Sequence, residues 1–268
     1  MPTDSLRDAR KTVERAERAA EADEQERLQG AARREAARRA LQVRQRTGVR
    51  RFLFENGLSL VAFGLFALAL VGQTLTGAAR YNEERRDHGQ LPVSIGAYVT
   101  SGAFLEATAE NWESEFLQMG VFVVLTIFLY QRGSSESKRI EESEAVDQRP
   151  EEARGDPDAP WPVRHGGLPL ALYKHSLSLT LFALFAVSFA MHAVGGASDY
   201  NEEQRLHGGA ELSPLGYLGT SRFWFESFQN WQSEFLAVGV LVVLTIWLRE
   251  QGSPQSKPVA APHHDTGE

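Results

Sequence analysis

Two sets of titratable side chains recur at helical spacing in this chain. On an α-helix each set would form one face: Tyr81, Glu84, Arg85 and His88 in the first, and Tyr200, Glu203 and His207 in the second. Imidazole and carboxylate groups are suitable ligands for divalent transition metals. If two such helices lie side by side, the spacing predicts a metal site made of Glu84, His88, Glu203 and His207.

The same residues have two other interpretations. A helix that leaves a membrane needs polar residues, so they could form a structural polar collar in which each Glu and His is an i, i+4 pair. They could also line a solute-binding vestibule, to which Tyr81, Glu115, Tyr200 and Glu234 would contribute. Metal sites in carboxylate helix bundles use Glu-x-x-His, one residue shorter than the spacing found here, so that analogy does not transfer.

An internal duplication relates these two sets. Residues 58–138 align without a gap with residues 177–257 at a constant offset of 119, and about 37 of the 81 aligned positions are identical. Such a repeat decides the architecture before other features do. We therefore expect two copies of one structural unit.

Four apolar runs predict the elements that position the two sets. No Asp, Glu, Lys or Arg occurs in residues 58–75, 116–129, 177–194 or 235–248, although 24% of the chain is charged. A bilayer core of about 30 Å needs about 20 largely apolar residues. We predict an all-α membrane protein with four transmembrane helices, arranged as two tandem parallel-repeat helical hairpins. A soluble fold would leave these runs without polar outer faces.

The basic residues indicate an orientation for these hairpins. Six arginines lie between residues 38 and 51 and seven Lys or Arg in residues 132–174, against three in 78–115 and two in 197–234. By the positive-inside rule, both termini and the connector are cytoplasmic and the loops within the hairpins lie outside. The basic cluster Arg38–Arg51 could also bind anionic lipid.

Composition divides the chain into five parts. We expect a charged, Ala/Arg/Glu-rich cytoplasmic helical segment (1–51), hairpin repeat 1 (52–133), a disordered cytoplasmic connector (134–167), hairpin repeat 2 (168–251) and a disordered tail (252–268). The first helix of each hairpin should continue beyond the membrane, to Gly89 in the first copy.

Catalysis is not indicated. The chain has no Cys, nucleotide-binding loop, nucleophile elbow or His-Glu-x-x-His motif, so we predict neither an enzyme nor a cofactor. Within the apolar runs His192 aligns with Gln73, so no ionisable residue occupies equivalent positions of the two repeats inside the membrane. This argues against an ion-coupled carrier. Basic stretches lack interleaved aromatic residues, so no nucleic-acid partner is expected.

The first repeat resembles a bacterial membrane-protein family known only as a domain of unknown function. The resemblance is carried by Tyr-Asn-Glu-Glu-x-Arg-x-His-Gly from Tyr81, by the run from Ser94 to Ala107, and by Glu-Asn-Trp-Glu-Ser-Glu-Phe-Leu-Gln-Met from Glu110. Residues 52–138 match closely, and residues 170–257 match more loosely, with Gln232 at the position of Glu113. The resemblance implies a bacterial inner-membrane location, and it identifies no functional residue.

Two functions therefore remain open. The first is a non-catalytic structural or interaction protein of the bacterial envelope, whose extracytoplasmic loops are its working surface. The alternative is a passive pore, or a membrane protein that binds a small solute or divalent metal on the pseudo-twofold axis between the hairpins. A homo-oligomer is compatible with either function, and the sequence does not identify a protein partner.

Overall fold

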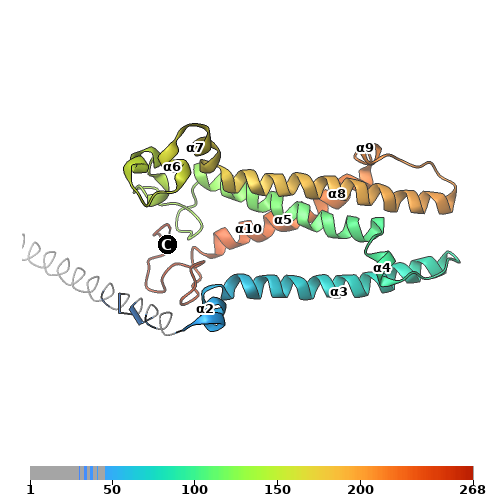
Figure 1. Ribbon diagram of the computed structural model, residues 1–268, viewed down its shortest axis with the longest axis horizontal. Helices are drawn as coiled ribbons and strands as arrows, with labels where there is room; N and C mark the ends of the chain where they lie inside the picture. The colour runs from blue at the N-terminus through green and yellow to red at the C-terminus, as the bar shows by residue number, and fades with distance from the viewer. Residues whose placement is uncertain (1–29, 31–32, 35–36, 39–40, 42–45, 268) are drawn as a thin grey trace, which may run out of the picture. The chain divides into compact units, whose positions relative to one another are not determined.

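The computed structural model describes residue 30, residues 33–34, 37–38 and 41, and residues 46–267. Every regular element in this part of the chain is a helix (Figure 1). In chain order these are α2 (Gly48–Glu55), α3 (Gly57–Asp87), α4 (Ile95–Tyr98), α5 (Gly102–Phe128), η1 (Ala145–Asp147), η2 (Pro150–Gly155), α6 (Trp161–His165), α7 (Gly167–Lys174), α8 (Ser176–His207), α9 (Pro214–Tyr217) and α10 (Ser221–Leu244). Most of the predicted charged segment 1–51 lies outside the described residues.

Two helices are long and apolar enough to cross a bilayer, α3 with 31 residues and α8 with 32. The other two predicted spans, α5 and α10, do not meet this criterion because polar residues occupy their first halves. In α5 the uncharged apolar part is residues 116–128, about 20 Å of helix at 1.5 Å per residue, against a hydrocarbon core of about 30 Å. The prediction of four spans therefore remains a prediction.

The chain divides into two compact units, one ending at Gln73 and the other beginning at Thr74. The first contains α2 and the beginning of α3. Its apolar side chains Leu58, Phe63 and Leu68 are largely exposed. A helix of a soluble protein would bury such residues in a core. Their exposure is typical of a helix that faces lipid.

The long helices extend beyond their apolar runs as predicted. Helix α3 continues to Asp87 and is followed by Gly89 at φ +70°, and α8 continues to His207 and ends at Gly208 in the left-handed conformation. Glycine adopts positive φ without the steric cost of a Cβ, which explains why both helices stop there.

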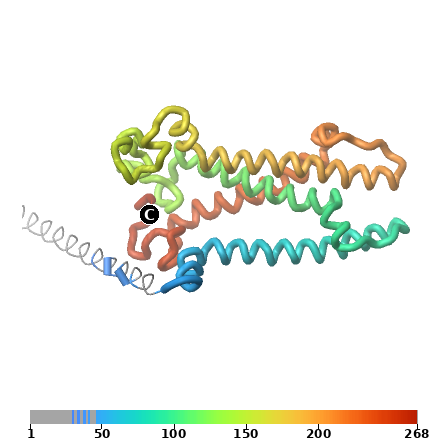
Figure 2. The backbone as a smooth tube through the Cα atoms, viewed as in Figure 1, coloured from blue at the N-terminus to red at the C-terminus, as the bar shows by residue number. Residues whose placement is uncertain are grey.

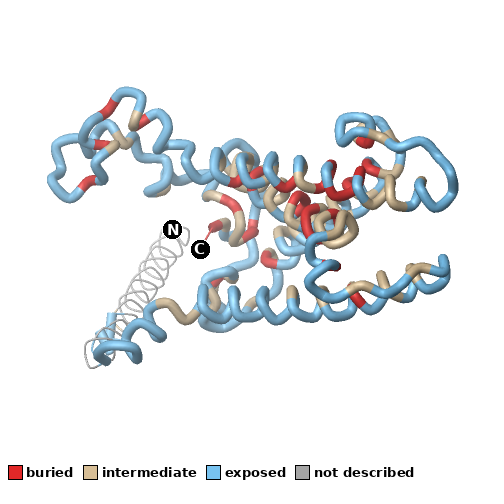
Figure 3. Tube along the Cα trace, turned by 45° about the vertical axis from the view of Figure 1, so that its right-hand side comes forward, coloured by how far each residue is buried: buried red, intermediate tan, exposed pale blue. Residues whose placement is uncertain are grey.

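In the second unit, α5 runs along α8 and is crossed by α10 (Figure 1). Two glycines permit this close approach. A Cβ at Gly195 of α8 would lie 2.5 Å from the backbone nitrogen of Glu106, and one at Gly102 of α5 would lie 2.7 Å from that of Asp199. Many of the buried residues of the second unit lie on α5 and α8 (Figure 3). A buried apolar cluster joins α8 to α9 and α10. It consists of Ala193, Ala197, Tyr217 and Phe223, flanked by Phe189, Tyr200 and Leu218.

The loops that follow α3 and α8 are held in the same way. The amide of Asn82 donates to the carbonyl of Val93 (3.0 Å) and accepts from its backbone N–H (2.7 Å). Asn201 forms the same pair of bonds with Leu212, both at 2.8 Å. In each loop a tyrosine then packs on a glycine of the preceding helix, so neither glycine has room for a Cβ. These are Tyr98 on Gly77 and Tyr217 on Gly196.

The connector and tail, which we predicted as disordered, carry local structure. The connector contains η1, η2, α6 and the first residue of α7. The tail lies against the beginning of the connector (Figure 2). There the N–H of Gly267 donates to the carbonyl of Ser134 (3.0 Å). The buried ammonium of Lys257 donates to three carbonyls of the tail, those of Pro262, His263 and Asp265. Composition gave no indication of these bonds, because a polar sequence does not reveal which of its groups will pair with one another.

Candidate functional site

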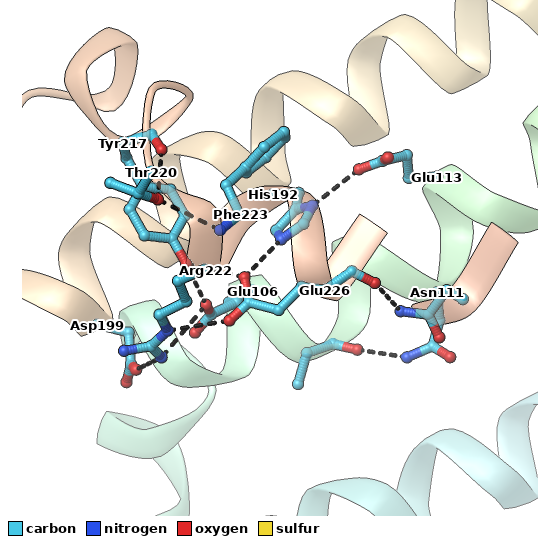
Figure 4. Close-up of polar contacts among 12 residues, drawn as sticks. Glu106, Asn111, Glu113, His192, Asp199, Tyr217, Thr220, Arg222, Phe223 and Glu226 are labelled. Carbon is cyan, nitrogen blue, oxygen red and sulfur yellow. Dashed lines mark hydrogen bonds and ion pairs between the residues drawn. The ribbon is translucent and has the colours of Figure 1, made fainter. Parts of the chain in front are cut away.

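A buried histidine is the centre of a polar cluster between α5, α8, α9 and α10 (Figure 4). The side chain of His192, on α8, has no exposed surface. Its Nδ1 lies 2.8 Å from Oε2 of Glu113 on α5, and the indole N–H of Trp231 donates to the other oxygen of that carboxylate (3.0 Å). Phe223 stacks on the imidazole ring with 4.6 Å between centroids. These contacts fix the orientation of His192 and direct its Nε2 away from Glu113.

Nε2 of His192 faces Glu226, a half-buried residue on α10, at 3.3 Å from Oε2. The same oxygen accepts from the hydroxyl of Tyr217 (2.8 Å), and that hydroxyl also lies 3.1 Å from Oε1 of Glu106. A tyrosine hydroxyl has one proton to donate. If Tyr217 donates to Glu226, its bond to Glu106 needs a proton on the Glu106 carboxyl group.

Arg222 on α10 pairs with several carboxylates of the cluster. Its guanidinium pairs with Glu226 (2.9 Å), Asp199 (2.8 Å) and Glu203 (3.0 Å), and lies 3.5 Å from Glu106. Four carboxyl groups thus belong to the buried and half-buried part of the cluster, those of Glu106, Glu113, Asp199 and Glu226. Against them stand one guanidinium and one imidazole, so full ionisation gives four negative and two positive charges, a net of −2.

Surroundings of low polarity change the protonation of the acids that precede the apolar run of α5. Burial, and then the charges of Asp199 and Glu226, raise the pKa of Glu106 to about 8. Burial also raises the pKa of Glu110, one turn further along α5, to about 7. Burial pushes Glu226 in the same direction, but hydrogen bonds from His192, Arg222 and Tyr217 prevail and lower its pKa. At neutral pH Glu106 is therefore mostly protonated, and Glu110 is partly protonated.

Three groups of this cluster have the geometry to hold a metal ion. One ligand atom from each of Glu106, His192 and Glu226 lies within 4.8 Å of the others. Two carboxylates and an imidazole are a donor set that suits Zn²⁺ and similar first-row divalent ions. Glu113 would hold the imidazole from behind, as metal-binding histidines are commonly held by a carboxylate on the second nitrogen.

The cluster has no counterpart in the first copy of the aligned segment. At the offset of 119, His192, Arg222 and Glu226 align with Gln73, Ala103 and Ala107. The cluster combines Glu106 and Glu113 from the first copy with residues of the second. Our expectation of a site with equal contributions from both copies does not describe it.

The predicted metal residues lie nearby, at the ends of α3 and α8. The rings of His88 and His207 are 5.9 Å apart between centroids. Glu84 pairs with Arg80 (3.0 Å) and Glu203 with Arg222 (3.0 Å). A cleft of about 350 Å³ joins all four predicted residues with Tyr81, whose hydroxyl donates to Glu202 (2.8 Å). The four are brought together, and their binding of a metal remains a prediction.

The other predicted collar residues lie elsewhere. Tyr200 packs against Tyr217, with 6.0 Å between ring centroids. Glu115 is exposed and Glu234 is half-buried, and neither side chain forms an ion pair or hydrogen bond within the described part of the chain. Sequence reasoning missed Glu106, Glu113, Arg222 and Glu226, because it placed them in the loops within the hairpins, outside the membrane. One signal was available: His192, Arg222 and Glu226 depart from the residues with which they align.

Comparison with known proteins gives one finding. A family model described as a domain of unknown function (DUF6766) matches residues 49–268. No curated protein and no solved structure matches the chain.

Proposed function

The chain belongs to DUF6766, a family of unknown function, and we propose that it is a membrane protein that binds a divalent cation at Glu106, His192 and Glu226. One observation carries this proposal. Glu113 holds Nδ1 of a fully buried imidazole, so Nε2 faces two further carboxyl groups within 4.8 Å.

The charge of the cluster supports a cation rather than an anion or neutral solute. A buried group of charges with a net of −2 is costly unless it takes up protons or a positive ion. A divalent cation would offset this charge. Because ligand groups must be deprotonated, it would displace the proton that Glu106 holds at neutral pH and any proton on Nε2 of His192. Cation uptake should therefore release protons.

The proposal includes the arrangement in the membrane. We infer two tandem parallel hairpins in a bacterial inner membrane, with both termini cytoplasmic and the cluster near the outer surface. The repeated order of a long helix, a short helix and a long helix supports this, as do the matching Asn82 and Asn201 bonds and the charge bias of the loops. Arg38–Arg51 would then lie at the cytoplasmic surface, where anionic lipid attracts basic residues.

Isothermal titration of the purified full-length protein with Zn²⁺ tests the proposal. All samples carry glutamine at His88, His207, His263 and His264 to remove competing imidazole pairs. We expect about one strong site per chain, and His192→Gln, which introduces the residue found at the aligned position 73, should weaken it by about 10-fold or more. His175→Gln is the matched control. Equal affinity before and after His192→Gln, in protein that remains helical and monodisperse, would refute the proposal.

A structural or interaction role in the envelope is the second candidate. Only Ser227 Oγ and Arg249 Nε are buried side-chain atoms without a hydrogen-bond partner among the described residues, so the cluster satisfies its own polar groups. It could serve as a specific clamp between helices. In that case His192→Gln should lower thermal stability in the absence of metal, and Zn²⁺ should stabilise neither protein.

A further inference from the structure

The cleft between the ends of α3 and α8 contains two histidines with the same tautomer. Nδ1 of His88 lies 2.8 Å from the carbonyl oxygen of Glu84, and Nδ1 of His207 lies 2.9 Å from that of Glu203. A carbonyl oxygen only accepts, so each Nδ1 carries the proton and donates. Each Nε2 is then left with a lone pair.

Neither Nε2 has a hydrogen-bond partner within the part of the chain that the structure describes. Both imidazoles line the same cleft of about 350 Å³. Their ring centroids are 5.9 Å apart and their planes are almost perpendicular, at 86°. Zinc–imidazole bonds are about 2.0–2.1 Å long, so two imidazoles on one ion have centroids about 4.5–6.5 Å apart. The observed separation falls within this range.

The backbone bonds supply the support that metal-binding histidines need. A histidine ligand ordinarily donates its other ring N–H to a carbonyl or carboxylate, which fixes the tautomer and orients the ring. Here both helices provide it identically, because the acceptor lies four residues earlier in each. The bonds from Nδ1 to the carbonyls of Glu84 and Glu203 would also occur in a structural collar. They leave Nε2 of each ring free to bind a metal.

The charges around the cleft also favour a cation. Its acidic lining residues are Glu84, Asp199, Glu202 and Glu203, and its arginines are Arg80, Arg85 and Arg222, so four negative charges face three positive ones, a net of −1. Each arginine is paired with an acid, as Arg85 is with Glu202 (2.9 Å). The charge of each guanidinium in the cleft is therefore offset by a carboxylate partner.

We propose that His88 and His207 form a second metal site, an open two-imidazole site for a transition-metal ion such as Cu²⁺ or Zn²⁺. It differs from the predicted four-residue site in its ligands. The carboxylates of Glu84 and Glu203 pair with Arg80 and Arg222, and water would complete the coordination. The site stands on its own contacts and does not depend on the Glu106–His192–Glu226 cluster.

Electron paramagnetic resonance of Cu²⁺ bound to the full-length protein tests this site. The starting protein carries His263→Gln and His264→Gln, so that the paired histidines of the tail do not contribute, and His192→Gln, so that the buried cluster does not. We expect nitrogen hyperfine structure from two imidazoles at one equivalent of Cu²⁺. Either His88→Gln or His207→Gln should reduce it to one imidazole and weaken binding by at least about 10-fold.

The control is His165→Gln, which removes a histidine outside the cleft. Loss of the two-nitrogen signal only in the cleft variants would establish the site, whatever the titration of the buried cluster shows. A signal and affinity unchanged by His88→Gln combined with His207→Gln would overturn it. Glu84→Gln should leave the two-nitrogen signal in place; its loss in folded protein would overturn the assignment to imidazoles alone and return the carboxylate to the ligand set.

Discussion

At the scale of residues, the cluster depends on which group holds each proton. Tyr217 has one hydroxyl proton and two carboxyl neighbours, Glu106 and Glu226. Hydrogen bonds from His192 and Arg222 keep Glu226 ionised, while burial keeps Glu106 protonated near neutral pH. The two acids thus differ in protonation although one hydroxyl touches both. Such separation by environment is frequent at functional sites.

Glu106 should make the stability of the protein depend on pH. Its pKa rises from the ordinary value of 4.5 to about 8 in the folded protein, so the unfolded chain loses this proton first. The resulting stabilisation is complete below about pH 4.5 and is lost as the pH rises to about 8. Glu106→Gln imitates the protonated acid, so the stability difference between variant and wild type should grow in favour of glutamine across this range.

Thermal unfolding in detergent at pH 5, 6.5 and 8 measures this difference. Glu115→Gln, which changes an exposed acid of the same helix, is the control. A difference between Glu106→Gln and wild type that stays constant with pH would contradict the assignment of the proton to Glu106.

At the scale of elements, the close contact between α5 and α8 positions the cluster. It needs Gly195, because a Cβ there would meet the backbone nitrogen of Glu106 at 2.5 Å. Backbone cannot move aside as a flexible side chain can. Gly195→Ala should therefore separate the helices, lower stability by about 1–3 kcal/mol, and weaken Zn²⁺ binding at the cluster.

Gly239→Ala is the matched control for this substitution. Gly239 lies in α10, and a Cβ at this position would have no atom within 4 Å. Alanine favours helix by up to about 1 kcal/mol over glycine, so this variant should be neutral or slightly more stable. Equal effects of the two substitutions on chemical denaturation would show that the crossing does not require a glycine.

The sequence predicted the helices better than the contacts between them. The apolar runs, with Gly89 after the first, correctly indicated where α3 continues. It did not reveal that α5 packs on α8, so Glu106 and Glu113 were not connected with His192. One sequence contains no signal for pairing between helices that are distant along the chain, and acids in α5 look like those of any solvated helix.

At the scale of the whole molecule, the proposed arrangement places the cluster near the outer surface of the membrane. The absence of cysteine allows a direct test of topology. Single cysteines at Asp87, Leu206 and Glu136 are labelled in intact cells with a membrane-impermeant maleimide. We expect labelling at 87 and 206 and none at 136, with full labelling of all three after the cells are opened.

Other labelling patterns have definite meanings. Labelling at 136 alone would invert the topology and place the cleft in the cytoplasm. Labelling at only one of 87 and 206 would make the two hairpins antiparallel, and would contradict the parallel arrangement that we infer from the charge bias.

The most direct test of the central claim is X-ray absorption spectroscopy of Zn²⁺ bound at the buried cluster, in protein whose His88, His207, His263 and His264 are replaced by glutamine. Our account predicts one imidazole nitrogen and carboxylate oxygens at about 2.0–2.2 Å, and loss of the imidazole contribution in His192→Gln. A spectrum without imidazole, or one that His192→Gln leaves unchanged, would contradict the account.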